Sequence, residues 1–170
     1  MHIFKAMKTL VYKSPIGELE IAIGNGCVVM IDWLANPRHE RILRDVRPFV
    51  NTSPNDEAIS GQVCSELEAY FDGRIAEFHF PYEIIGTPFR KKTLSTLAKV
   101  PYGTTVSYSD LAIMAGTPDG VRAIASAVAR NPLNIVIPCH RVIASNGGIG
   151  GYAGGVETKR FLLALENVRM

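Results

Sequence analysis

Cysteine is scarce in this sequence, and so are long apolar runs. The three cysteines among 170 residues are too few and too far apart to form a disulfide framework. No apolar run approaches the roughly 18 residues that a membrane-spanning helix needs. Lysines interrupt the N-terminus before any apolar segment long enough for a secretion signal. We therefore expect a cytoplasmic protein with free thiols and no membrane contact.

Net charge is also small, at +2, but it is unevenly distributed along the chain. Residues 1–85 carry 8 Lys or Arg against 12 Asp or Glu, a net charge of −4, whereas residues 86–170 carry 10 against 4, a net charge of +6. A basic half attached to an acidic half suggests that the basic half binds a polyanion. Two independently solvated surfaces would give the same numbers. We place a domain boundary here, between an N-terminal domain at 1–85 and a second domain at 86–170.

The N-terminal domain has the pattern of a small α/β unit. Short β-branched or alternating runs at 9–12, 19–23 and 28–31 are separated by turn sequences, a spacing that predicts an antiparallel meander. Apolar residues at helical spacing predict a helix over 56–71. The polar, arginine-rich residues 37–48 are compatible with a helix and residues 78–82 with one more strand. No cluster of reactive side chains is visible in this domain.

Two longer helices are predicted in the second domain. Thr87 and Pro88 have the character of an N-cap and a first-turn proline, so we expect a helix over 89–100, and apolar spacing predicts another over 157–167. The side chains expected to face inward from these helices are Phe89, Leu94, Leu97, Val100, Phe161, Leu162 and Leu165.

Between these helices lie a short helix, a turn and a second short helix. We expect Ser109 to cap the first, at 110–114, and the second to cover 120–129. This order is typical of a helix-turn-helix, although many such matches bind no DNA. The second helix has Arg122 at its start and small residues on most faces, which would allow close approach to a phosphate backbone. A tightly packed core helix would have the same composition.

Cys139 lies in the segment 138–142, Pro-Cys-His-Arg-Val, after an apolar run at 134–137 that predicts a short buried strand. A bend at the proline would present the next side chain, and His140 and Arg141 would favour the thiolate, which is the reactive form of cysteine. A buried, inert thiol is the alternative, and we assume it for the other two cysteines. Zinc is disfavoured because no nearby pattern completes a set of ligands.

A glycine-rich segment follows at 146–155 and holds six of the fifteen glycines. It lacks the context of a dinucleotide fingerprint and the Gly-Lys-Ser/Thr of a phosphate loop. It fits a mobile loop around Tyr152 that forms a flat substrate wall, and it equally fits a plain surface loop. Glu166, near the end of the last helix, is by default a solvated carboxylate. The sharper alternative is an acid partner for His140.

Together these motifs resemble those of the methylated-DNA–protein-cysteine methyltransferases, also called 6-O-alkylguanine-DNA alkyltransferases. The similarity runs without a gap from about residue 101 to 166, and loosely back to residue 89. Residues 1–85 share only the general character of a ribonuclease-H-like α/β domain with an antiparallel sheet plus a helix. The resemblance implies that this domain is followed by a mostly α, winged-helix-like C-terminal domain with a helix-turn-helix.

The resemblance also implies an activity: direct-reversal DNA repair by a single-turnover transfer. Without any cofactor, Cys139 would take a methyl or alkyl group irreversibly from the 6-oxygen of guanine in duplex DNA, which inactivates the protein. His140 would draw the thiol proton through a water, and Glu166 would orient His140. Asn131 would brace the turn, and Tyr108 would protonate or hydrogen-bond the departing base.

The partner implied is double-stranded DNA containing alkylated guanine, bound by a monomer. Arg122 would enter the stack in place of the flipped base, with its helix in the minor groove, and Tyr152 would help close over that base. The other DNA contacts expected are Ala123, Tyr108, Ser109, Thr117, Arg130 and Ser145, and the other substrate contacts are Val142, Ala153 and Arg141.

The sequence departs from the family pattern at one pair of residues, and two other functions compete with alkyl transfer. Thr93-Leu94 stands where bacterial members usually have Val-Trp, which changes helix packing. Some eukaryotic relatives bind zinc, but His2, Cys27, His39 and Cys64 form no matching set, so no metal is expected. The rivals are a non-catalytic alkyltransferase-like lesion-binding protein, whose members lack the cysteine of the motif, and a multiple-turnover cysteine hydrolase.

Overall fold

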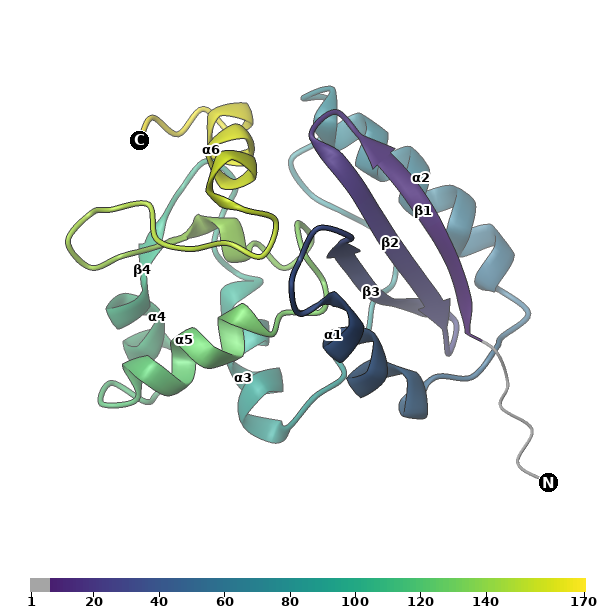
Figure 1. Cartoon of the computed structure of the whole chain (residues 1–170), viewed down its shortest axis with the longest axis horizontal. Coiled ribbons are helices and arrows are strands. Elements are labelled where there is room, and N and C mark those ends of the chain that lie inside the picture. Colours follow the sequence, from purple (N-terminus) through teal and green to yellow (C-terminus); the bar gives the residue numbers. More distant parts are fainter. Residues whose placement is uncertain (1–6) are drawn as a thin grey trace.

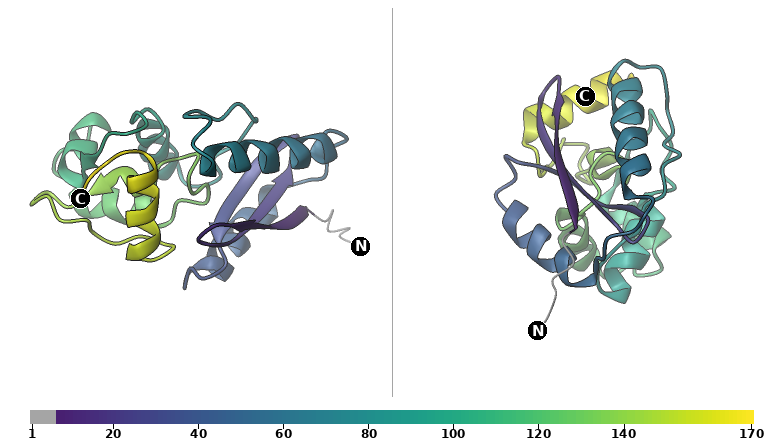
Figure 2. Two further views of the ribbon diagram at one scale, coloured as in Figure 1. Left: turned by 90° about the horizontal axis from the view of Figure 1, so that it is seen from above. Right: turned by 90° about the vertical axis from the view of Figure 1, so that its right-hand side faces the viewer.

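The computed structural model describes residues 7–170. Residues 7–85 form a three-stranded antiparallel sheet, in the order β1-β2-β3, with helices on both faces (Figure 1, Figure 2). The predicted meander and the helix at 56–71 are therefore confirmed. In chain order the elements are β1 (Lys8–Ser14), β2 (Gly17–Gly24), β3 (Cys27–Trp33), α1 (His39–Val46), the 3-10 helix η1 (Arg47–Phe49) and α2 (Asp56–Phe71).

The two faces of the sheet bury different helices, because side chains alternate along a strand. Leu19 and Ile21 of β2 share one apolar cluster with Val63 of α2, whereas Ala22 shares a second cluster with Ile42 of α1. α2 has four acidic side chains and no basic one, and the segment from residue 38 to 47 has four arginines. The acidic helix α2 and the segment 38–47, in which the four arginines outnumber Glu40 and Asp45, thus lie on opposite faces of the sheet.

Residues 86–170 are mainly helical, as predicted. α3, α4 and α5 pack against one another, and the short strands β4 and β5 pair in parallel. Thr87 caps α3 as predicted, since its side chain accepts a hydrogen bond from the Arg90 N–H at 3.2 Å. None of the helices within residues 7–170 has the length and apolar character to cross a membrane. The elements are α3 (Pro88–Leu97), β4 (Val106–Ser107), α4 (Tyr108–Met114), α5 (Val121–Ala129), the 3-10 helix η2 (Cys139–Arg141), β5 (Val142–Ile143) and α6 (Val156–Leu165).

The two strands predicted from apolar runs at 78–82 and 134–137 are wrong. The first segment makes one isolated bridge to β3, at Tyr82, because Pro81 has no N–H with which to continue the pairing. The second segment turns instead of extending, since Ile135 has a φ of 74°, which lies outside the strand region. Residues 134–137 are largely buried without forming a strand, whereas His79, Pro81 and Tyr82 of the first segment are exposed.

Two predictions about helix positions are also wrong. Ser107, and not Ser109, caps α4, because the Asp110 N–H donates to the Ser107 Oγ at 3.0 Å. The helix therefore begins at Tyr108. Phe89, at the start of α3, is 37% exposed, whereas Leu94 and Leu97 of the same helix are fully buried. Ser107 and Ser109 lie on either side of the first helical residue, so the residue type alone does not identify the cap.

The two halves share one apolar core. Buried side chains of β2, β3 and α2 belong to the same cluster as Leu133, Ile137 and Cys139. The backbone joins them as well: the Ile31 N–H donates to the Pro132 carbonyl, and the Asn134 N–H donates to the Ile31 carbonyl, each at 2.8 Å. The segment that precedes Cys139 is thus tied to the end of the sheet.

Candidate active site

Cys139 opens η2 at the junction of the two halves, directly after Pro138. Its N–H donates to the Ile137 carbonyl at 2.8 Å, and its Sγ donates to Oδ1 of Asn134 at 3.4 Å. The thiol is buried but lines a cavity of about 410 Å³, a volume typical of small-molecule sites. Residues on the other walls of this cavity include Tyr108, Asn131, Tyr152 and Ala153.

His140, the residue after Cys139, forms a buried pair with Glu166. Nε2 of His140 lies 2.5 Å from Oε2 of Glu166, and Nε of Arg141 donates to Oε1 of the same carboxylate at 2.7 Å. Burial favours protonation of Glu166, but the hydrogen bonds from His140 and Arg141 outweigh it and hold the pKa of Glu166 below its usual value. Glu166 is therefore a carboxylate that accepts hydrogen bonds, and the solvated alternative is excluded by its burial.

The geometry assigns the tautomer of His140. Burial lowers the pKa of His140, and this effect outweighs the neighbouring Glu166 carboxylate, so the ring is neutral near pH 7. Nε2 carries the hydrogen that Glu166 accepts, which leaves a lone pair on Nδ1. Nδ1 is buried and has no hydrogen-bond partner within residues 7–170. The imidazole can therefore accept a proton at Nδ1.

Cys139 is held as a neutral thiol. Burial raises its pKa to about 11, although a hydrogen bond from Asn131 and the charge of Lys159 oppose this. The expectation that His140 and Arg141 favour the thiolate is wrong, because the His140 ring is neutral and the Arg141 guanidinium is bound to Glu166. A nucleophilic reaction at this sulfur needs a base to remove the proton.

Asn131 connects the two ends of the turn that precedes Cys139. Its Nδ2 donates to the Ile137 carbonyl at 2.9 Å, and its Oδ1 accepts from the Leu133 N–H at 2.9 Å. The side chain is buried and replaces the hydrogen bonds that a strand would have made. The structure therefore places Asn131 where it can brace this turn.

Two tyrosines face the thiol across the cavity. Burial raises the pKa of Tyr108 and, more strongly, that of Tyr152, and the Cys139 side chain adds to both shifts. Both phenols are protonated near pH 7 and can donate a hydrogen bond. The Tyr152 hydroxyl accepts from Nε1 of Trp33 in β3 at 3.0 Å, so the N-terminal half helps to position the glycine-rich loop.

Of the other three predicted substrate contacts, one lines the cavity and two do not. Ala153 lines the cavity with Cys139. The side chains of Arg141 and Val142 do not line it, because Arg141 is bound to Glu166 and to the Val100 carbonyl and Val142 is fully buried in the core.

The predicted DNA-contacting residues lie on and around α5. Arg122 and Ala123 are exposed at its start, and Arg130 follows its end. Ser109 and Ser145 lie together, with their hydroxyl oxygens 2.8 Å apart. The Thr117 hydroxyl is instead buried, without a hydrogen-bond partner among the described residues.

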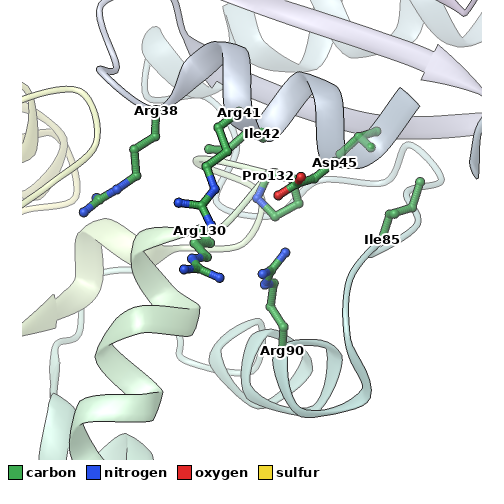
Figure 3. Close-up of a pocket in the computed structure, with 9 residues that line it drawn as sticks. Arg38, Arg41, Ile42, Asp45, Ile85, Arg90, Arg130 and Pro132 are labelled. Atoms are coloured by element: carbon green, nitrogen blue, oxygen red, sulfur yellow. The ribbon is translucent and has the colours of Figure 1, made fainter. Parts of the chain in front are cut away.

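Three arginine side chains, those of Arg41, Arg90 and Arg130, point toward one another where α1, α3 and the end of α5 meet (Figure 3), and Arg38 lines the same hollow. Arg38 and Arg41 come from the N-terminal half, and Arg90 and Arg130 from the other half. Asp45 is the single carboxylate among the residues that line this hollow. Within residues 7–170, no ion pair involves any of the four arginines. Partial burial and the charge of Arg130 lower the pKa of Arg90. This cluster is suited to bind an anion.

Sequence reasoning missed several of these groups. The arginine-rich segment at 37–48 was visible, but nothing in it indicates that it faces Arg90 and Arg130. Lys159 is fully buried, and its Nζ donates to the carbonyls of Val142 and Gly151, while burial lowers its pKa to about 8. The segment from residue 7 to 170 contains no cluster of three potential metal ligands; His2 lies outside the described residues.

Comparison with known proteins identifies the class and the family. A model described as "6-O-methylguanine DNA methyltransferase, ribonuclease-like domain" matches residues 7–84, and one described as "6-O-methylguanine DNA methyltransferase, DNA binding domain" matches residues 88–168. The class that the fold and the site define is thus a methylated-DNA–protein-cysteine methyltransferase. The chain belongs to the 6-O-methylguanine DNA methyltransferase family, which confirms the resemblance.

Individual relatives agree with this assignment over nearly the whole chain. A methylated-DNA–protein-cysteine methyltransferase of Mycobacterium tuberculosis is 40% identical over 160 residues, covering 92% of this chain and 90% of the relative. One of Methanosarcina barkeri is 35% identical over 156 residues, covering 92% and 94%. The crystal structure of M. tuberculosis O6-methylguanine methyltransferase has a TM-score of 0.78 at 32% identity, covering 95% and 93%. That of M. tuberculosis OGT in complex with DNA has a TM-score of 0.75 at 34% identity, covering 92% and 90%.

Proposed function

We propose that this protein repairs DNA by direct reversal, with Cys139 accepting a methyl or alkyl group from the 6-oxygen of guanine. The observation that carries the proposal is the buried Glu166–His140 pair, whose histidine directly follows in sequence a neutral thiol that lines a cavity. A neutral thiol is a weak nucleophile, and an adjacent base activates it. Relatives named methylated-DNA–protein-cysteine methyltransferases support the same activity.

The reaction is a displacement at the alkyl carbon. An electron pair of the Cys139 Sγ forms the new S–C bond while the C–O bond to the base breaks, and the thiol proton passes through a water to Nδ1 of His140. Glu166 stabilises the imidazolium that results. The product is a thioether, which does not hydrolyse. Each protein therefore acts once, and the step needs no cofactor.

The departing guanine carries developing negative charge that the cavity neutralises. The protonated phenol of Tyr108 donates to the base as it leaves. Asn131 keeps the turn before Cys139 in place, and Tyr152, Ala153 and the loop beyond Ser145 close over the flipped base. Arg141 acts through Glu166, and Val142 contributes its backbone.

The DNA partner is a duplex that contains alkylated guanine. We assign α4, the turn and α5 to a helix-turn-helix in a winged-helix-like domain, with the exposed start of α5 in the minor groove. Arg122 fills the gap left by the flipped base, with Ala123 beside it. Further contacts come from Tyr108, Ser109, Arg130 and Ser145, and from the backbone of Thr117, whose hydroxyl is buried. The arginines that line a hollow with Arg130 support a phosphate-binding surface there.

We assign a separate role to each of the two domains. An N-terminal α/β domain over 1–85 supports the site, and a domain over 86–170 binds DNA and holds the acceptor thiol. The protein acts as a monomer in the cytoplasm. A shared apolar cluster between the two parts is compatible with this arrangement.

Mass spectrometry after incubation with a methylated duplex tests the proposal. We expect a mass increase of one methyl group per protein, located on Cys139, and none with the Cys139→Ser variant. A non-catalytic lesion-binding protein would bind the duplex and gain no mass. A cysteine hydrolase would process many substrate molecules and end with a free thiol.

A further inference from the structure

Asn134 links the reactive thiol to the N-terminal half. Its side chain is fully buried, with Oδ1 accepting from the Cys139 Sγ at 3.4 Å. Its Nδ2 donates to Oδ1 of Asp32 at 2.9 Å and to the Ile31 carbonyl at 3.2 Å. Turning the amide round would place its oxygen against a carboxylate and a carbonyl. The orientation that presents an oxygen to the thiol is therefore fixed.

Asp32, in turn, is held in place by a buried histidine. Nδ1 of His39 lies 2.8 Å from Oδ2 of Asp32, and its Nε2 lies 2.5 Å from Oε2 of Glu20. With a carboxylate at each ring nitrogen, both nitrogens donate, so the ring is an imidazolium. Burial would lower the pKa of His39, but the two carboxylates together raise it. Asn36 also donates to Asp32, at 3.1 Å.

We propose that Asn134 is a positioning residue for Cys139, and that Asp32 of the N-terminal half sets its orientation. The amide oxygen directs the S–H bond and keeps the resting sulfur protonated until His140 withdraws the proton. This inference rests on the proposed function of Cys139 as the alkyl acceptor. It gives the N-terminal half a chemical role at the site, in addition to its role in packing.

The physical reason is the polarity of the fixed amide. A thiol can donate to the Asn134 oxygen, whereas a thiolate would face that oxygen's lone pairs and be destabilised. The other groups around the sulfur act in both directions: a hydrogen bond from Asn131 and the charge of Lys159 favour the thiolate, and the charge of Asp32 disfavours it. The neighbouring His140 ring and the phenols of Tyr108 and Tyr152 are neutral. A reactant that is used once gains from this arrangement, because a thiol reacts slowly with other electrophiles.

The pH dependence of Cys139 labelling by iodoacetamide tests this role without DNA. Peptide mass spectrometry distinguishes Cys139 from the other two cysteines. A range of about pH 8 to 12 extends above the raised pKa of Cys139, which is about 11. We expect Asn134→Ala to lower the midpoint by about half to one pH unit, the size of one lost hydrogen bond. Water that enters from the cavity would shift the midpoint in the same direction, since it can donate to a thiolate.

A double-mutant cycle shows whether Asp32 acts through Asn134. Asp32→Asn frees the amide to turn and removes a negative charge, so it should also lower the midpoint. In the Asn134→Ala background, the shift in midpoint caused by Asp32→Asn should decrease to the part that comes from the lost charge alone. Glu20→Gln is the comparison variant, because it changes the far end of the network and leaves the Asp32–Asn134 hydrogen bond in place. We expect a smaller shift from it than from Asn134→Ala.

The outcomes separate this inference from the proposed function. Transfer from a methylated duplex is measured on the same proteins, with circular dichroism to verify that each is folded. An unshifted midpoint in folded Asn134→Ala, or an equal shift in Glu20→Gln, overturns the role of Asn134. Failure of the unmutated protein to take up a methyl group overturns the proposed function and leaves the titration interpretable.

Discussion

At the scale of single residues, the chemistry depends on a carboxylate that is nowhere near the thiol in sequence. Glu166 lies 26 positions after His140, and its burial would cost free energy without partners. Arg141 and the Tyr70 hydroxyl supply them. Because the Arg141 guanidinium balances the carboxylate, the imidazole can stay neutral next to it. Glu166 therefore orients His140 without causing its imidazole to be protonated before the reaction.

The rate of alkyl transfer should depend on pH through His140. The base must be neutral to accept the proton, and burial lowers its pKa. The rate should therefore decline only below the ordinary histidine value of about 6.5, as falling pH protonates the ring. Single-turnover rates with a methylated duplex at about pH 5 to 8 measure this. A rate that has already halved above pH 6.5 would contradict the assignment of His140 as a neutral base.

At the scale of elements, α1 is the unexpected contributor. It belongs to the half in which the sequence shows no reactive cluster, yet Arg41 points into the hollow that Arg90 and Arg130 also line (Figure 3). Like charges this close repel one another, and a bound phosphate would relieve that repulsion. Helices from both halves thus form one basic surface beside the cavity that Cys139 lines.

Arg41→Gln should weaken duplex binding more than Arg44→Gln does. Both residues belong to α1, but Arg44 does not line the hollow with the other arginines. Loss of one phosphate contact reduces the slope of log affinity against log salt concentration by about 0.9. Fluorescence anisotropy with an unmodified duplex at several salt concentrations gives this slope. Equal slopes for the two variants would show that only overall charge matters.

The elements with regular apolar spacing are the ones that the sequence predicts well. The meander and α2 follow their patterns. Residues 134–137 have the apolar character of a strand, but they form a turn. In this turn the side chains of Asn131 and Asn134 make the hydrogen bonds that neighbouring strands would otherwise make. At the site, Cys139 and His140 are adjacent in a motif. Asp32 and Arg41 lie near the site only because of tertiary packing, which no local sequence pattern encodes.

At the scale of the whole molecule, the two halves meet through specific contacts as well as through apolar packing. Trp33, at the end of β3, donates to the Tyr152 hydroxyl and packs edge-on against its ring. The loop that carries Tyr152 passes so close that Gly154 lies against the indole. The glycine-rich loop therefore depends on the sheet for its position.

Gly154→Ala should destabilise the protein through this contact. A Cβ at this position would lie 2.8 Å from Cδ1 of Trp33, and overpacking of this kind costs about 1–3 kcal/mol. Gly151→Ala is the matched control in the same loop, since its Cβ would meet nothing within 4 Å. Urea unfolding of the two variants gives the difference in free energy of unfolding. Equal losses would mean that the loop shifts away from the indole at no cost.

α2 and the segment 38–47 make the N-terminal half an electric dipole. α2 has a net charge of −4 on one face of the sheet, and the segment has four arginines against Glu40 and Asp45, a net charge of +2, on the other. Near a duplex, such a dipole experiences a torque as well as an attraction. When the protein comes within about 8 Å of the duplex, the Debye length at physiological salt, it turns so that the arginines face the DNA and the carboxylates face away from it. A half with a net charge of −4 thereby increases the share of encounters that begin in the productive orientation.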